Sequence, residues 1–309
     1  MSAPGAGGAP PAGPRPGPGR PYIDVHVHIG DTINRTPPVG QSAETFLGRM
    51  AQSGVVAGVL CPAAGGPQAR GVADTREQNE AVAAACRRWP ERFPVGLTVV
   101  EVRQLRAGVD ELERAMDASG LAGFMVHPGI SGHQLGPVLD DWLEVVDARD
   151  GLVLLHVGGG RTEAGAAALA RRYRRASFIT AHVSMSPAGH RAAVEHLAGL
   201  DNVWADFAQH PEADDAGWDL ADLVRHFGTE RLLFGSDSPY FDHRRLQAQI
   251  ERAALPEATK DGIAYANAVG LIRRFRPEWS PAAAPPEVPA TLAGVDLWRE
   301  QPGQPGRLL

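Results

Sequence analysis

The sequence predicts a (β/α)8 barrel, also called a TIM barrel, because short apolar runs alternate with helical patterns from residue 21 to about residue 275. Eight runs have the composition of buried strands: 22–28, 54–61, 93–100, 121–127, 152–157, 177–183, 202–207 and 231–236. Between them, apolar residues recur at helical spacing in 45–52, 77–89, 102–118, 138–148, 163–173, 188–197 and 220–227. Strict alternation of this kind places parallel strands inside and helices outside, and eight such units in about 255 residues have the size of one barrel.

The two ends of the chain differ in composition from the predicted barrel. The first 20 residues include 16 Gly, Ala or Pro and have no apolar segment long enough for a secretory signal. We therefore expect a disordered leader over 1–20, a single barrel domain over 21–280 and a Pro/Ala-rich tail over 281–309. Only 292–298 in the tail has apolar side chains to pack, weakly, against the barrel or a second subunit. We expect neither end to be needed for the chemistry.

Charge and cysteine usage exclude several classes of protein. The net charge is −6 and the pI is near 6.0, so the chain has no general attraction to nucleic acid or to anionic membranes. No apolar run is long enough to span a bilayer. The two cysteines, Cys61 and Cys86, form no disulfide framework and no metal-binding spacing. We expect a cytoplasmic protein that acts on a small molecule, either as a monomer or as a homodimer.

Histidine and aspartate side chains occur near the carboxyl ends of four predicted strands. His26 and His28 end the first strand, His156 lies on the fifth, His182 lies on the sixth, and Asp237 follows the eighth. The carboxyl ends of barrel strands surround one pocket. Imidazole nitrogens and a carboxylate that meet there are suited to bind a divalent ion such as Zn²⁺.

The first strand concentrates polar groups on one face. His26 and His28 are two residues apart, so both should point to the same side of the strand, together with Asp24. A single buried histidine is more often a hydrogen-bonded core residue, but several at the ends of barrel strands are costly unless they are hydrogen-bonded or bind a metal. Five further histidines fall in helical or polar contexts, where we expect them to be solvated: His133, His190, His196, His226 and His243.

These motifs resemble those of the amidohydrolase superfamily, in the branch of metal-dependent hydrolases and decarboxylases that includes aminocarboxymuconate semialdehyde decarboxylase. The similar residues are the Asp-Val-His-Val-His motif of 24–28, His156, His182 and the Gly-Ser-Asp-Ser-Pro segment of 235–239. The resemblance covers roughly residues 22–275. It is specific for the family but not for a substrate.

The resemblance implies a set of roles for these residues. His26, His28, His156 and Asp237 would hold one divalent ion, preferably zinc, with manganese as the alternative. His182 would approach the water on that ion, and Asp237 would also accept the proton of the water. Zinc lowers the pKa of its bound water from about 15.7 towards about 7. His182 and Asp237 are therefore the expected catalytic residues.

The number of metal ions follows from one position on the fourth strand. Relatives with two metals usually bridge them through a carboxylated lysine in the middle of the barrel. Here that position is Met125, and Lys260, the only lysine of the chain, lies in the final helical segment. We therefore expect one ion.

Side chains on the loops after the strands are candidates for substrate contact. Arg161 follows a run of three glycines that lacks the residues of a phosphate-binding loop. His127 ends the fourth strand, where it either faces the substrate or caps the strand. Arg35 and Tyr240 follow the first and eighth strands.

The resulting functional prediction is a metal-dependent hydrolase that uses an activated water on a C–O or C–N bond of a small lactone, amide or related acid. The first alternative is a metal-dependent non-oxidative decarboxylase of an aromatic or unsaturated acid. The predicted first loop has no long aromatic insertion that would enclose a ring, which favours hydrolysis. A second alternative is a barrel that contains a metal and binds a ligand without turnover.

Overall fold

A computed structural model describes residues 19–32, 39–210 and 220–298 of the chain. Each of the eight predicted strand ranges overlaps an observed strand, and the third range contains two. In chain order these strands are β1 (Tyr22–Thr32), β3 (Val55–Pro62), β4 (Val95–Gly96), β5 (Thr98–Val99), β6 (Gly123–Val126), β7 (Leu152–His156), β8 (Ser177–Ala181), β9 (Val203–Asp206) and β10 (Leu232–Leu233). One further strand, β2 (Val39–Gln41), pairs antiparallel with β1 and was not predicted.

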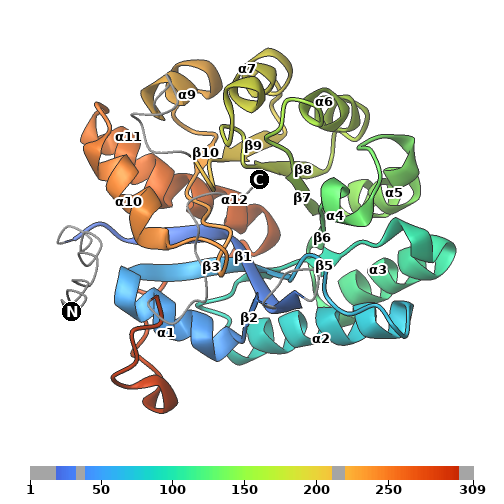
Figure 1. Cartoon of the computed structure of the whole chain (residues 1–309), viewed down its shortest axis with the longest axis horizontal. Coiled ribbons are helices and arrows are strands. Elements are labelled where there is room, and N and C mark those ends of the chain that lie inside the picture. Colours follow the sequence, from blue (N-terminus) through green and yellow to red (C-terminus); the bar gives the residue numbers. More distant parts are fainter. Residues whose placement is uncertain (1–18, 33–38, 211–219, 299–309) are drawn as a thin grey trace, which may run out of the picture.

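The strands form two sheets whose edges are bridged by backbone hydrogen bonds. The sheet orders are β2-β1-β3-β4 and β10-β9-β8-β7-β6-β5, and all pairs apart from β1 with β2 are parallel. On one side the amide of Ala122 donates to Gly96 across 2.8 Å. On the other side the amides of Val25 and Asp237 donate to Phe234 and His26, each across 3.0 Å. Figure 1 shows the strands at the centre with helices around them.

Helices follow the strands as the alternation predicted. The longer ones are α1 (Ala43–Ser53), α2 (Val72–Arg88), α3 (Leu105–Ser119), α5 (Asp140–Ala148), α6 (Glu163–Arg172), α7 (Pro187–His196), α9 (Leu220–Phe227), α10 (His243–Arg252) and α12 (Asn267–Phe275). Two short helices are α4 (Pro128–Ser131) and α11 (Glu257–Asp261). The Ser42 side chain caps α1 by accepting a hydrogen bond from the Thr45 amide, and Gly54 ends this helix in the left-handed conformation. No helix among the described residues is long and apolar enough to cross a membrane.

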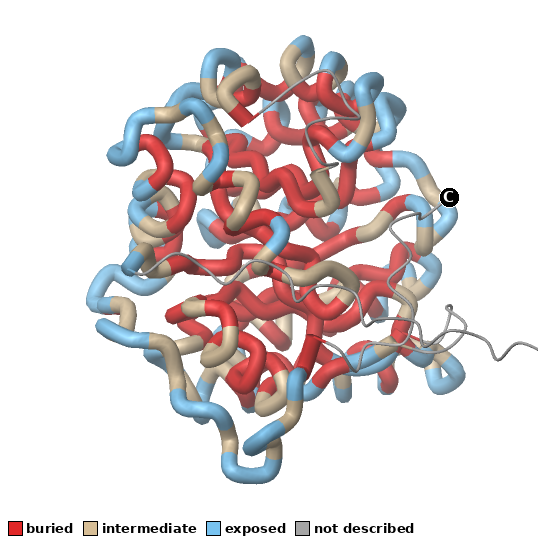
Figure 2. The backbone as a smooth tube through the Cα atoms, turned by 60° about the vertical axis from the view of Figure 1, so that its left-hand side comes forward, coloured by how far each residue is buried: buried red, intermediate tan, exposed pale blue. Residues whose placement is uncertain are grey.

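Two apolar layers pack against the strands. An inner cluster combines strand residues such as Leu154, Ile179 and Leu233 with Leu271 and Ile272 of α12. An outer cluster packs the opposite faces of the strands against the surrounding helices. Burial is accordingly concentrated on the central strands, and the connecting loops are more exposed (Figure 2). This arrangement leaves the carboxyl ends of the strands as the place for polar side chains.

A register shift in β1 contradicts the expected alternation. Pairing between β1 and β3 is irregular between Asp24 and Val27. Ile23 and Val25 belong to the inner cluster, whereas Val27 and Ile29 belong to the outer one. The prediction that Asp24 shares a face with His26 and His28 is therefore wrong, because a shift of one residue exchanges the two faces of a strand.

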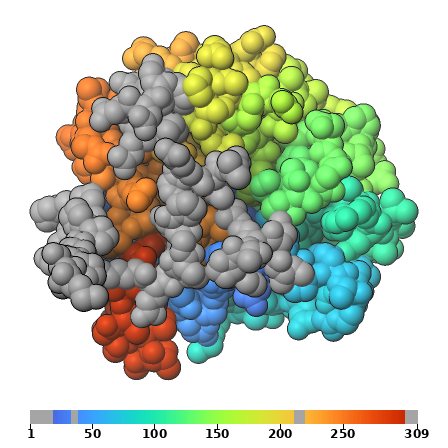
Figure 3. Space-filling view, viewed as in Figure 1, coloured from blue at the N-terminus to red at the C-terminus, as the bar shows by residue number. Residues whose placement is uncertain are grey.

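The segment after α12 returns along the outside of the helices. Its described part lies beside α1, where the red and blue segments meet in Figures 1 and 3. The Gln52 side chain donates to the carbonyl of Val295 across 2.7 Å, and Leu297 lies against Gly48. Leu297 and Trp298 are both buried. The apolar residues predicted to pack in the tail thus contact the outer helices of the same chain.

Candidate metal centre

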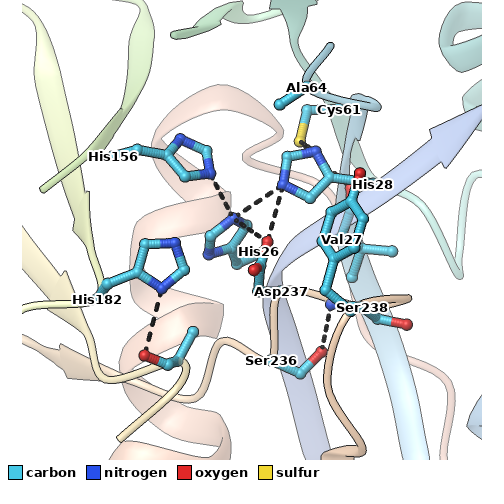
Figure 4. A network of polar contacts seen from close by, with 12 residues as sticks. His26, Val27, His28, Cys61, Ala64, His156, His182, Ser236, Asp237 and Ser238 are labelled. Carbon is cyan, nitrogen blue, oxygen red and sulfur yellow. Dashed lines mark hydrogen bonds and ion pairs between the residues drawn. The ribbon is translucent and has the colours of Figure 1, made fainter. Parts of the chain in front are cut away.

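Four imidazole rings and one carboxylate meet at the carboxyl ends of the strands (Figure 4). Nε2 of His26 lies 3.1 Å from Nε2 of His28 and 3.2 Å from Nε2 of His156. Oδ1 of Asp237 lies 3.2 Å from Nε2 of His26 and 3.1 Å from Nε2 of His28. All of these side chains and that of His182 are buried. The sequence predicted that these five residues meet at the strand ends, and in the structure their side chains lie together there.

Two overlapping sets of four ligands are possible within this group. One ligand atom from each of His26, His156, His182 and Asp237 lies within 4.8 Å of the others. His28 is not in that set, although it is in close contact with His26 and Asp237. The geometry therefore allows His182 to be a ligand as well as a neighbour of the bound water.

The outer nitrogens of the rings are all occupied by hydrogen-bonding partners. Nδ1 of His28 lies 2.8 Å from the carbonyl oxygen of Pro62, and Nδ1 of His156 and His182 lie 3.2 Å from the carbonyl oxygens of Val126 and Ala208. A carbonyl oxygen only accepts, so each Nδ1 carries the proton and each neutral ring has a bare Nε2. Bare nitrogens about 3 Å apart repel one another unless a cation lies between them. The donor set therefore fits a divalent ion.

Asp206 is the functional residue that the sequence reasoning missed. Its Oδ2 lies 3.0 Å from Nδ1 of His26, and its Oδ1 accepts hydrogen bonds from the amides of His182 and Ala208, each across 3.0 Å. Asp206 is the last residue of β9, so a carboxylate at the end of the predicted seventh strand was the available signal. It orients His26 and makes the Nε2 of that ring more basic.

The charges of these groups determine how protons compete with a metal. Burial alone would lower the pKa of His26, but Asp206 and Asp237 together raise it to about 10. Burial would raise the pKa of Asp237, but His26 and His28 hold it well below its usual range. The His26 imidazole thus takes a second proton when no other cation is present. A metal must displace that proton, so affinity for the metal falls as pH decreases.

Three residues at the centre have an uncommon backbone conformation. His182, Gln209 and Asp237 have φ angles of 63°, 61° and 60°. Non-glycine residues in this left-handed region are strained by about 1–2 kcal/mol, and such residues cluster at functional sites. Gln209 donates its side-chain amide to Oδ2 of Asp237 across 2.7 Å. The left-handed conformation thus occurs at the two residues His182 and Asp237 of the centre. It also occurs at Gln209, which donates a hydrogen bond to Asp237.

His127 is a neighbour of the centre and a helix cap. Its Nδ1 accepts a hydrogen bond from the amide of Ile130 across 3.2 Å, which caps α4. Its ring lies 4.6 Å from the ring of His156, with 32° between their planes. The two roles considered from the sequence, a strand-end cap and a residue near the substrate, are therefore compatible.

His127 is expected to remain neutral well below pH 6. Burial and the neighbouring His182 lower the pKa of His127 to about 4. The unfolded chain takes up this proton near pH 6.5, and the folded chain does not, so His127 reduces the free energy of unfolding as pH falls from 6.5 to 4. The His127→Gln variant should show a shallower loss of stability in urea titrations over this pH range. An unchanged slope, or an imidazole NMR titration midpoint near 6.5, would contradict this prediction.

The other predicted substrate contacts are placed differently. Tyr240 lies near the centre, with its ring 5.6 Å from that of His28 and its hydroxyl hydrogen-bonded to Thr32. Arg161 is exposed on the loop between β7 and α6 and has no hydrogen bond or ion pair to another described residue. Arg35 lies outside the described residues. The structure therefore places one of these three side chains beside the metal centre.

Two histidines expected in solvent are buried instead. His243 is fully buried, with Nε2 at 3.2 Å from Oδ2 of Asp24. His190 is buried between Ser184 and Asp222. A polar helical context did not reveal these partners, because they come from other elements of the fold. Met125 is buried in the inner cluster, and Lys260 in α11 donates to the carbonyl oxygen of Glu251.

The sequence matches the family described as Amidohydrolase over residues 23–274. The chain therefore belongs to the amidohydrolase family, as the resemblance of its motifs predicted. The search of curated proteins found no significant match.

Several solved structures have the same fold at low sequence identity. The 2,6-dihydroxybenzoate decarboxylase from Rhizobium is 17% identical with a TM-score of 0.64, over 83% of this chain and 99% of that one. A probable 2-pyrone-4,6-dicarboxylic acid hydrolase from Acinetobacter baumannii is 17% identical with a TM-score of 0.61, over 81% and 98%. The 5-carboxyvanillate decarboxylase from Novosphingobium aromaticivorans, complexed with manganese, is 14% identical with a TM-score of 0.60, over 82% and 96%.

Proposed function

We propose that this member of the amidohydrolase family is a hydrolase with one divalent ion, preferably zinc, that cleaves a C–O or C–N bond of a small lactone, amide or related acid. The observation that carries the proposal is the convergence of bare imidazole nitrogens on Oδ1 of Asp237. We also propose that its strands close into one (β/α)8 barrel, supported by the hydrogen bonds across both sheet edges. His26, His28, His156 and Asp237 would hold the ion.

The chain's own residues supply the proton transfers of such a reaction. A bound divalent ion would lower the pKa of water and polarise the substrate carbonyl. Asp237 accepts a proton from the attacking water, because its carboxylate is ionised and Gln209 keeps it oriented at the centre. His182 orients that water, then takes the proton from Asp237 and donates it to the leaving oxygen or nitrogen as the C–O or C–N bond breaks. Burial lowers the pKa of His182, so it starts the cycle as a neutral base.

Substrate selection is assigned to the residues around the carboxyl ends of the strands. His127 and Tyr240 would contact the substrate, because both lie within ring-contact distance of the metal ligands. Arg161 and Arg35 would pair with a carboxylate on the substrate, because a guanidinium binds a carboxylate with two hydrogen bonds. Arg161 is exposed on the loop that follows β7, the strand that ends in His156.

A decarboxylase is the second candidate function. It is favoured by the likeness of the fold to 2,6-dihydroxybenzoate and 5-carboxyvanillate decarboxylases. Decarboxylation needs a proton delivered to carbon, whereas hydrolysis needs a proton taken from water. Hydrolysis is preferred here because the predicted first loop has no long aromatic insertion that would enclose a ring.

One experiment separates the two candidates and tests the metal content. Purified full-length chain should contain about one equivalent of divalent ion, measured by elemental analysis. It should then hydrolyse at least one compound in a panel of lactones and amides without releasing carbon dioxide from a panel of hydroxybenzoates. Release of carbon dioxide with no hydrolysis would replace the hydrolase by the decarboxylase. Two equivalents of metal, or none, would overturn the proposed centre.

A further inference from the structure

The buried carboxylate of Asp24 links two segments of the metal centre. One is β1, which carries His26 and His28, and the other is the 236–238 turn, which carries Asp237. Oδ1 of Asp24 accepts hydrogen bonds from the amides of His26 and Ser236, across 3.1 and 2.9 Å. Oδ2 of Asp24 accepts a hydrogen bond from the Ser236 hydroxyl, which in turn accepts one from the amide of Ser238. Asp24 thus stabilises the register shift of β1 before His26 and the turn that presents Asp237.

His243 of α10 contacts Asp24 from the outer layer. Its Nδ1 is hydrogen-bonded to the Ser53 hydroxyl across 3.2 Å, and its Nε2 lies 3.2 Å from Oδ2 of Asp24 without the geometry of a hydrogen bond. The ring of His243 lies 4.7 Å from that of Trp298, at an angle of 68°. Trp298 therefore covers the outer side of a chain of contacts that leads through His243 and Asp24 to His26.

A second chain of contacts leads from the same tryptophan to His28. The guanidinium of Arg49 lies 5.2 Å from the ring of Trp298 and donates to Oε1 of Gln41. The Gln41 amide donates to the carbonyl of His28 across 2.7 Å and to the hydroxyl of Ser238 across 3.3 Å. Arg49 is itself buried, so losing the ring above it would expose a charged group that is now held in place.

Trp298 is held in this position by the C-terminal segment. Gln52 of α1 donates to the carbonyl of Val295, and the side chain of Leu297 fills the space above Gly48. A β-carbon at Gly48 would come within 2.5 Å of Leu297, which shows how closely the segment packs on α1. The two contact chains therefore begin at one residue of a segment that the sequence predicted to be dispensable.

We propose that Trp298 is a positioning residue for the metal centre, and that residues 295–298 complete the support of its ligands. This inference rests on the proposed metal centre. Trp298 does not touch the ligands. It packs against His243 and Arg49. Arg49 donates to Gln41, which bonds to His28 and Ser238, and His243 lies against Asp24, which bonds to His26 and Ser236. Groups that orient metal ligands from outside typically affect metal affinity by about 10–100-fold.

The test compares metal affinity with thermal stability in full-length variants. Trp298→Ala should raise the Kd for Zn²⁺, measured by chelator competition, by about tenfold, whereas Trp298→Phe should keep it within about threefold because a ring still covers His243. Trp279→Ala is the matched control. Trp279 is equally buried, but it donates to the carbonyl of Glu91 and packs with the inner cluster beside α12. This control should lower Tm and leave the Kd unchanged.

Two variants of His243 test the contacts that lead from Trp298 through His243 to Asp24. They keep the inference testable if Trp298→Ala fails to fold. His243→Gln places an amide near Asp24 and should bind zinc almost as the parent does, whereas His243→Leu should weaken binding by about tenfold. If Trp298→Ala and His243→Leu lower Tm but leave the Kd within twofold of the parent, the role is only structural and the inference is overturned. A parent chain that binds no ion would instead overturn the proposed centre itself, and with it this inference.

Discussion

The His26→Ala variant is expected to lose its divalent ion and all measurable turnover. Nε2 of His26 lies within 3.2 Å of His28, His156 and Asp237, so its removal takes away the nitrogen that all three contact. It also leaves Asp206 buried without the ring that it bonds, which costs about 1–3 kcal/mol of stability or more for a charged group. We expect a lower Tm together with the loss of metal.

Three measurements separate these effects. Elemental analysis and chelator competition report metal, and thermal unfolding of the apo protein reports stability. The double variant His26→Ala with Asp206→Asn should recover part of the stability, because the unpaired charge is gone, but none of the metal. His226→Ala is the control, since His226 is an exposed histidine on α9. His26→Ala protein that retains one equivalent of ion would contradict the proposed ligand set.

Replacing His182 is expected to reduce turnover by about 10²–10⁴-fold while the metal is retained, which is the range for loss of a general acid or base. His182→Asn is the sharper variant. The backbone of His182 has a positive φ of 63°, and asparagine adopts that conformation more readily than alanine. An amide can also hydrogen-bond to water but cannot take its proton. His182→Ala should therefore show the same loss of rate with an additional loss of stability.

The alternative role for His182 gives a different result. A ligand nitrogen of His182 lies within 4.8 Å of those of His26, His156 and Asp237, so the residue can bind the ion directly. In that case His182→Asn would lose metal and activity together. Retention of metal with the parental rate on a confirmed substrate would remove His182 from the mechanism altogether.

The sequence predicted the strands well because each is a short apolar run with its own boundaries. It failed where a local pattern was interrupted. β1 continues to Thr32 and pairs antiparallel with β2, a pairing that no alternation signalled. The third strand range is split into β4 and β5 around Leu97. Asp24 was assigned to the wrong face because period-two alternation assumes an unbroken register.

What the sequence by itself determined is the set of groups able to bind a metal. His26, His28, His156, His182 and Asp237 end apolar runs, and parallel strands in an α/β fold place such ends on the same side of the molecule. The tertiary structure alone decided which groups orient them. Asp206 meets His26 from 180 positions away, and Trp298 reaches His243 from the far end of the chain. Such contacts depend on register and on packing between distant segments, and neither leaves a periodic signal in the sequence.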